Sequence, residues 1–269
     1  ARTMLEHQDS AYYDLVEDAV AHIETEHLVT FGMNLGYNSC TWGAQRIRAN
    51  EEQLGFNIPW SIFLQMDQFP HADCLASYDK TIDEGEQLGI YCWMLFSHGD
   101  PMTLFPLIEH HPDSAFFLLC QPEAITPAVL DEMTSLKHLM PVIRWNDRAG
   151  EACAMLRNAQ LPYSVYFPYS QNDLQSILTG DLFCETQQHH PLFTVLAGKP
   201  ACPSSIKRQY RCGRSSTTRP YRGSFPLTRG WWMRSSRTMP AVCFLTGRGR
   251  CLPWTTRTMP PLGICLRRG

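Results

Sequence analysis

GIYCWMLFS, residues 89–97, and SAFFLLC, residues 114–120, are apolar at almost every position. Successive side chains of a strand point to opposite faces, so a strand of this composition is buried on both faces. Strands of this kind are typical of parallel sheets that are covered by helices on both sides. We therefore expect these two segments to be strands of a parallel sheet.

Five other apolar runs have the same character, and helical patterns stand between them. The further expected strands are residues 27–35, 58–67, 139–145, 163–169 and 191–199. Helical periodicity of the apolar positions is found in residues 10–24, 73–88 and 148–159. Seven strands with short, partly helical connections predict an α/β fold, with a parallel (βα)-barrel or partial barrel in residues 1–200. An open doubly wound sheet is the alternative.

Two further helices are marked by their end signals. Thr126 is a helix cap with Pro127 at the first helical position, which is where proline is tolerated. Ser170 and Asp173 form a capping pair ahead of an apolar helical pattern, and Gly180 stops that helix. Both helices therefore follow expected strands, as a barrel requires.

Charge divides the chain into two parts. Residues 1–200 contain all 26 acidic residues and 9 of the 23 basic residues, a net charge of −17. Residues 201–269 contain the other 14 basic residues and no acidic residue, a net charge of +14. We expect a barrel-like domain in residues 1–200 and a poorly structured, basic Arg-rich C-terminal tail in residues 201–269.

Two interpretations of the Arg-rich tail compete. Arginine interleaved with Trp, Tyr and Phe could bind nucleic acid or an anionic surface. Alternatively, the tail is translated out of frame: shifting the frame by one base turns Trp231–Trp232 into Val and Trp254–Thr255 into Asp. We favour the out-of-frame interpretation because it explains the missing carboxylates and the clustered Trp together, and an eighth strand would then be scrambled.

The cysteines do not indicate a metal or disulfide framework. Seven of the 11 are widely spaced and include no C-x-x-C pair, at positions 40, 74, 92, 120, 153, 184 and 202. Zinc knuckles and iron–sulfur loops need closely spaced thiolates. We therefore expect the cysteines to be reduced and structural, and the protein to be cytoplasmic and intracellular. No apolar run in the sequence approaches the roughly 20 residues that a membrane-spanning helix needs.

Polar residues follow the expected strands, at the edge where a parallel barrel binds its ligand. After the first expected strand, the segment NLGYNSCTWGA offers Asn34, Tyr37 and Asn38 as substrate-binding residues, although its side chains could instead cap backbone groups. Later strand ends add three more substrate-binding candidates: Arg144, Tyr166 and Tyr169. Arg144 would hold an anionic group, unless Asp147 neutralises it.

Asp67, His98 and Glu123 end three successive expected strands and are the catalytic candidates. Together they could ligate a divalent cation or supply a general acid and base. In the alternative interpretation Asp67 caps a helix, Glu123 is a solvated loop residue and His98 is merely exposed. The pairs of histidines in EHH (109–111) and QQHH (187–190) are expected in surface loops, and no motif identifies a metal or cofactor.

These patterns predict a barrel enzyme that acts on a small polar or anionic substrate at the carboxyl ends of its strands. A nucleic-acid or anionic-surface binding protein is an alternative that depends on a genuine basic tail. The chain begins at Ala1 without an initiator Met. A further alternative is therefore an N-terminally truncated radical S-adenosylmethionine-type barrel, whose cluster-binding cysteines would precede Ala1. An inactive frameshifted product is the last alternative.

Overall fold

The structure is a computed structural model, and it describes residues 11–66, 72–198, 225–227 and 242–246. All strand pairs are parallel, and the strand order is β7-β6-β5-β4-β3-β2-β1-β8. The strands are β1 (Ser61–Gln65), β2 (Cys92–Phe96), β3 (Ala115–Cys120), β4 (Leu139–Arg144), β5 (Ser164–Tyr169), β6 (Phe193–Gly198), β7 (Phe225–Leu227) and β8 (Val242–Thr246).

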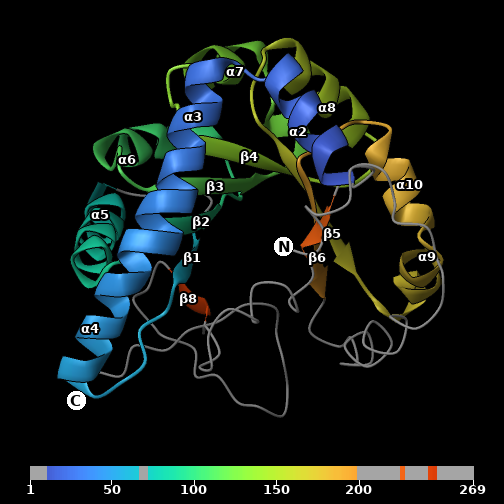
Figure 1. Cartoon of the computed structure of the whole chain (residues 1–269). Helices are drawn as coiled ribbons and strands as arrows, with labels where there is room; N and C mark the ends of the chain where they lie inside the picture. Colours follow the sequence, from blue (N-terminus) through green and yellow to red (C-terminus); the bar gives the residue numbers. More distant parts are fainter. Residues whose placement is uncertain (1–10, 67–71, 199–224, 228–241, 247–269) are drawn as a thin grey trace.

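The sheet is a curled half-barrel. Strands β1 to β6 pair in chain order, so each connection returns to the neighbouring strand and the order never reverses. This order is that of a (βα)-barrel and excludes the doubly wound alternative. Among the described residues no pairing joins the edge strands β7 and β8, so the half-barrel is open, as Figure 1 shows. The predicted partial barrel is confirmed.

Two short segments of the Arg-rich tail, β7 and β8, supply the edges of this sheet. The rest of residues 201–269 lies outside the described residues. The domain boundary near residue 200, the displaced frame and the nucleic-acid interpretation therefore stay predictions.

Helices cover the outside of the curl and one end of it (Figure 1). The helices of the N-terminal part are α2 (Ala11–His22), α3 (Thr25–Met33), the π-helix η1 (Asn34–Gly43), α4 (Ala44–Leu54) and α5 (Ala72–Leu88). They are followed by η2 (Pro101–Leu104), α6 (Phe105–His110), η3 (Pro122–Ala124), α7 (Pro127–Met133), α8 (Ala149–Asn158), η4 (Gln171–Asp173), α9 (Leu174–Thr179) and α10 (Asp181–Gln187). No helix in the described ranges is long and apolar enough to cross a membrane.

The end signals act as predicted. The side chain of Thr126 accepts a hydrogen bond from the backbone N–H of Val129 at the start of α7. Ser170 and Asp173 form a reciprocal capping box, and Gly180 ends α9 with a φ of 90°. Local sequence therefore determines where these helices begin and end.

The expected strand at residues 27–35 is wrong, because this segment is helical. His27, Phe31 and Asn34 are buried, at the spacing of one helix face. Val29 and Met33, which made the segment look like a buried strand, are 56% and 52% exposed. Residues 11–66 and 72–198 therefore contain six strands instead of the seven expected.

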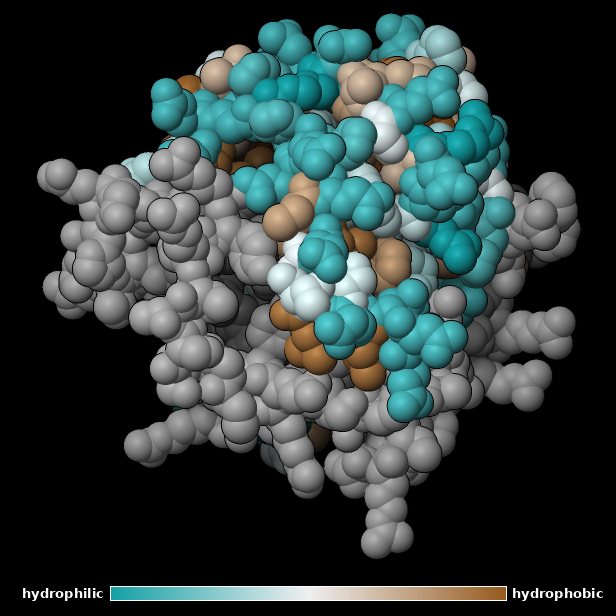
Figure 2. Space-filling model, turned by 90° about the vertical axis from the view of Figure 1, so that its right-hand side faces the viewer, coloured by the Kyte–Doolittle hydropathy of each residue, from teal (hydrophilic) through white to brown (hydrophobic). Residues whose placement is uncertain are grey.

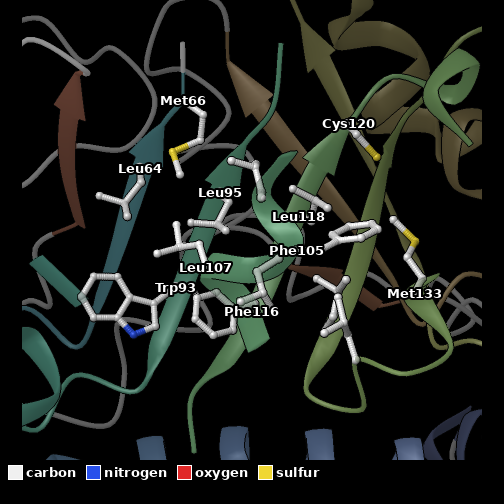
Figure 3. Packing of buried hydrophobic residues seen from close by; sticks show 14 of the residues in the cluster. Leu64, Met66, Trp93, Leu95, Phe105, Leu107, Phe116, Leu118, Cys120 and Met133 are labelled. Carbon is white, nitrogen blue, oxygen red and sulfur yellow. The ribbon is translucent and has the colours of Figure 1, made fainter. Parts of the chain in front are cut away.

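The main core lies between the convex face of the sheet and helices α5 to α8. Leu64, Trp93 and Phe116 point outward from neighbouring strands and pack with Phe105 and other residues of these helices (Figure 3). Trp93 is completely buried, and its ring lies against Gly85 of α5, where a Cβ atom would lie 2.5 Å from the ring. The outer helices have polar outer faces, and the described surface on the side of α9 and α10 is mostly hydrophilic (Figure 2).

The helices α3, η1 and α4 close the amino-terminal edge of the sheet. Asn34 donates to the carbonyl groups of Pro112 and Ser114, at 2.7 and 3.0 Å, just before β3 begins. Arg46 donates to the carbonyl group of Gln87, and His27 Nε2 lies 3.0 Å from the carbonyl oxygen of Leu139. These bonds satisfy backbone groups at the entrances of the strands, so these helices belong to the edge opposite the carboxyl ends.

Substitution of Gly43 tests the packing of η1 against the amino-terminal edge of the sheet. A Cβ atom at Gly43 would lie 2.4 Å from the carbonyl oxygen of Gly89, whereas one at Gly32 of α3 would meet nothing within 4 Å. We expect Gly43→Ala to lower the free energy of unfolding by about 1–3 kcal/mol, because backbone must shift. Gly32→Ala is expected to be neutral or to stabilise, since alanine favours a helix. Urea unfolding followed by far-UV circular dichroism measures both, and equal stabilities of the two variants would contradict the packing described.

Candidate functional site

Four of the nine predicted site residues lie at the carboxyl edge of the half-barrel. His98 follows β2, Glu123 lies in η3 after β3, Arg144 ends β4, and Tyr166 lies in β5. Parallel strands bring their carboxyl ends to one edge, so these residues share an edge of the sheet. Asp67 lies outside the described residues, and its role stays a prediction.

Register and alternation place several side chains on the concave face near this edge. Arg144 and Tyr166 are paired neighbours on β4 and β5. Gln65 and Phe96 are paired neighbours on β1 and β2 and lie on the same face. We call Gln65, Phe96, His98, Arg144 and Tyr166 the concave rim.

Contacts connect the members of the concave rim. His98 Nε2 lies 3.1 Å from Gln65 Nε2, and in this orientation the amide donates to the ring, which places the ring proton on Nδ1. The ring of Phe96 contacts His98 edge-to-face at a centroid distance of 4.5 Å, and Tyr166 at 6.1 Å. The concave rim is therefore a connected surface of aromatic rings, an amide and a cation.

Arg144 and Tyr166 give the concave rim its electrostatic character. Burial raises the pKa of Tyr166 to about 12, although the Arg144 guanidinium and the Gln121 side chain act in the opposite direction. The hydroxyl of Tyr166 therefore stays protonated at neutral pH and makes no hydrogen bond of good geometry within the described residues. Arg144 is exposed. It forms no ion pair within 4.0 Å with any described residue; the nearby Arg148 is the arginine that pairs with a carboxylate, that of Glu123. The alternative in which Asp147 neutralises Arg144 is therefore wrong.

Within the described residues His98 and Glu123 contact different partners, and the third member of the proposed catalytic trio, Asp67, lies outside them. His98 contacts Gln65 and Phe96, whereas the carboxylate of Glu123 lies 3.8 Å from Arg148 at the surface. No group of three metal-ligating side chains in residues 11–66 and 72–198 includes His98 or Glu123. General acid–base roles for these residues stay predictions.

Tyr169 lies on the opposite face of β5 from Tyr166. It follows Tyr166 by three positions, so the two rings point to opposite faces of β5. Tyr169 packs with Phe183 and other residues of α9 and α10 on the outer side. Its expected place beside the other substrate-binding residues is therefore wrong.

Asn34, Tyr37 and Asn38 lie at the opposite edge of the sheet, in η1. Asn34 and Asn38 donate to backbone carbonyl groups that precede β3, and Tyr37 is exposed. Their expected position beside the carboxyl ends is wrong, because it depended on a strand at residues 27–35. The alternative interpretation is confirmed: the amide side chains of Asn34 and Asn38 hydrogen-bond to backbone carbonyl groups.

Gln65 and Phe96 belong to the concave rim but were not among the predicted site residues. Both are common residue types, and neither carries a motif. The signal that could have identified them is parity: Gln65 and Phe96 are the last residues of their strands on the concave face. Strand ends must be known to within one residue before this signal can be used.

Comparison with known proteins identifies the fold. No protein-family model matches the sequence, and no curated protein sequence matches it. A crystal structure of SuiB from Streptococcus suis bound to S-adenosylmethionine is similar, with a TM-score of 0.53 and 10% sequence identity, over 79% of this chain and 62% of SuiB. A second structure of SuiB has a TM-score of 0.52 and 9% identity, over 82% of this chain and 67% of SuiB.

The chain shares the fold of SuiB. At this identity the similarity concerns the arrangement of strands and helices and does not extend to individual residues. The chain spans about three fifths to two thirds of the length of SuiB.

The described residues do not supply ligands for an iron–sulfur cluster. Within residues 11–66 and 72–198, no three cysteine thiols lie within ligating distance of one another. Burial raises the pKa of Cys92, and it raises the pKa values of Cys120 and Cys153 to about 12. These thiols are protonated members of the core, so the radical S-adenosylmethionine-type alternative finds no cluster site in this part of the chain.

Proposed function

We propose that this protein is a half-barrel enzyme that binds a small, carboxylate-bearing nucleoside of the S-adenosylmethionine class at the concave rim. The observation that carries the proposal is Arg144, an exposed guanidinium without a carboxylate partner in the described residues, beside the protonated hydroxyl of Tyr166. The fold similarity to SuiB, which was crystallised with S-adenosylmethionine, supports this ligand class.

The carboxylate and the purine of such a ligand each have a chemical counterpart at the concave rim. A guanidinium binds a carboxylate through two parallel charge-assisted hydrogen bonds, so Arg144 takes the carboxylate of the ligand. The hydroxyl of Tyr166 is a buried donor on the neighbouring strand, paired in register with Arg144. The rings of Phe96 and His98 offer aromatic surface to a purine, and the Gln65 amide fixes the His98 ring.

His98 is the candidate proton donor of the concave rim. Its Nε2 accepts from Gln65, which leaves the Nδ1–H group to donate to a bound molecule. Fixing the tautomer in this way orients the donor before the ligand arrives, which lowers the cost of binding.

Calorimetric titration of the full chain with S-adenosylmethionine, S-adenosylhomocysteine and adenosine tests the proposal. We expect both carboxylate-bearing ligands to bind at least about tenfold more tightly than adenosine, because adenosine cannot form the charge-assisted bonds with Arg144. Binding of adenosine as tight as that of the larger ligands, or no binding of any of the three, would overturn it.

A further inference from the structure

A second group of ionisable side chains lies between α5 and the end of α6, on the convex side of the sheet. Asp79, Asp83 and Glu86 follow one another at helical spacing on α5. His110 is the last residue of α6, and His111 comes directly after it. His111 is only 3% exposed, so the expectation that residues 109–111 form a surface loop is wrong for this residue.

Two imidazole nitrogens converge on one carboxylate oxygen. Asp79 Oδ1 lies 2.6 Å from His110 Nδ1 and 3.1 Å from His111 Nε2. These three atoms all lie within 4.8 Å of one another. Asp79 and His110 are partly open to solvent, whereas His111 closes the inner side.

We propose that Asp79, His110 and His111 bind a divalent transition-metal ion of the zinc class. Two neutral imidazoles and one carboxylate are a ligand set that zinc accepts, with water in the remaining position. The exposed side of the group leaves room for that water. This site is separate from the concave rim, because it lies on the helix-covered convex side.

The outer contacts of His111 are those that a ligating histidine needs. Its second nitrogen, Nδ1, lies 3.5 Å from Glu86 Oε1 and 3.9 Å from Asp83 Oδ1. Glu86 Oε1 accepts a hydrogen bond from Ser114 Oγ at 2.6 Å, and Ser114 Oγ accepts one from Trp93 Nε1 at 3.1 Å. A carboxylate on Nδ1 holds the proton there and directs the lone pair of Nε2 toward the ion.

A second aspartate with two nearby histidines, Asp18, shows by contrast why the Asp79 group is suited to bind a metal ion. Asp18 also has two histidines near it, with His22 Nδ1 at 3.1 Å and His190 Nδ1 at 3.6 Å. However, Arg157 donates to both carboxylate oxygens of Asp18, at 2.7 and 3.1 Å, and its charge opposes a second cation. Asp79 is instead accompanied by two further carboxylates on α5.

Zinc titration of the chelator-treated full chain, followed by calorimetry, tests the site. His110→Ala removes a mostly exposed ligand and is expected to weaken binding at least about tenfold without loss of fold, as checked by circular dichroism. Glu86→Gln is expected to weaken binding about 10–100-fold through the orientation of His111. His22→Ala is the matched control, since it removes another partly exposed histidine beside an aspartate, and it should leave the affinity unchanged.

Cobalt absorption spectra distinguish this site from the cysteines. Co²⁺ bound by nitrogen and oxygen gives visible bands without thiolate charge transfer, and His110→Ala should abolish these bands. The proposal is overturned if the spectrum shows thiolate charge transfer, if wild-type protein binds no zinc, or if His110→Ala and His22→Ala bind it equally.

Discussion

Replacing Trp93 with alanine is expected to lower the free energy of unfolding by about 3–5 kcal/mol. Trp93 is completely buried in the middle of the sheet, and its ring fills the space against Gly85 of α5. Its removal leaves a cavity that the surrounding strands can fill only in part. It also deprives Ser114 of the hydrogen bond from the indole N–H group.

Trp42→Ala is the matched control for this substitution. Trp42 is exposed and contacts Tyr91 at a centroid distance of 5.4 Å and Arg46 at 4.7 Å. Loss of these contacts is expected to cost about 1 kcal/mol. Urea unfolding followed by far-UV circular dichroism compares the variants, and a cost for Trp93→Ala no larger than that for Trp42→Ala would contradict the described core.

Arg144→Gln is expected to weaken the binding of S-adenosylmethionine by about 10–100-fold. Hydrogen bonds to a charged group contribute about 1.5–3 kcal/mol, and about 1.4 kcal/mol corresponds to a factor of ten in affinity. Glutamine keeps a polar, hydrogen-bonding side chain but is shorter and lacks the positive charge. Adenosine binding should be almost unaffected, because adenosine has no carboxylate.

Arg148→Gln provides the control for the Arg144 substitution. Arg148 follows the same strand, but its guanidinium lies 3.8 Å from the carboxylate of Glu123 at the surface. Calorimetry should give the wild-type affinity for this variant. If both substitutions weaken binding equally, general electrostatic attraction explains the result and Arg144 has no specific role.

Six strands could be predicted because their side chains are apolar on both faces and because helical patterns or turns stand between them. Residues 27–35 were misjudged because hydropathy does not show which residues are buried. In this segment the buried positions include His27 and Asn34, whereas Val29 and Met33 face outward. The polar side chains are buried because they hydrogen-bond to carbonyl groups at the sheet edge, which are distant in sequence.

The candidate site was predictable only in part. Arg144 and Tyr166 could be identified because parallel strands bring their carboxyl ends together. Gln65 and Phe96 could not, since their positions depend on the register of β1 with β2. The burial of His111 could not be predicted either, because its partners Asp79 and Glu86 lie on another helix.

A crystal structure of the full chain with bound S-adenosylhomocysteine is the sharpest test of the proposed ligand site. We expect the ligand on the concave face, with its carboxylate hydrogen-bonded to Arg144 and its purine against Phe96 and His98. A ligand at the amino-terminal edge beside Asn34, or on the convex side among the helices, would contradict it.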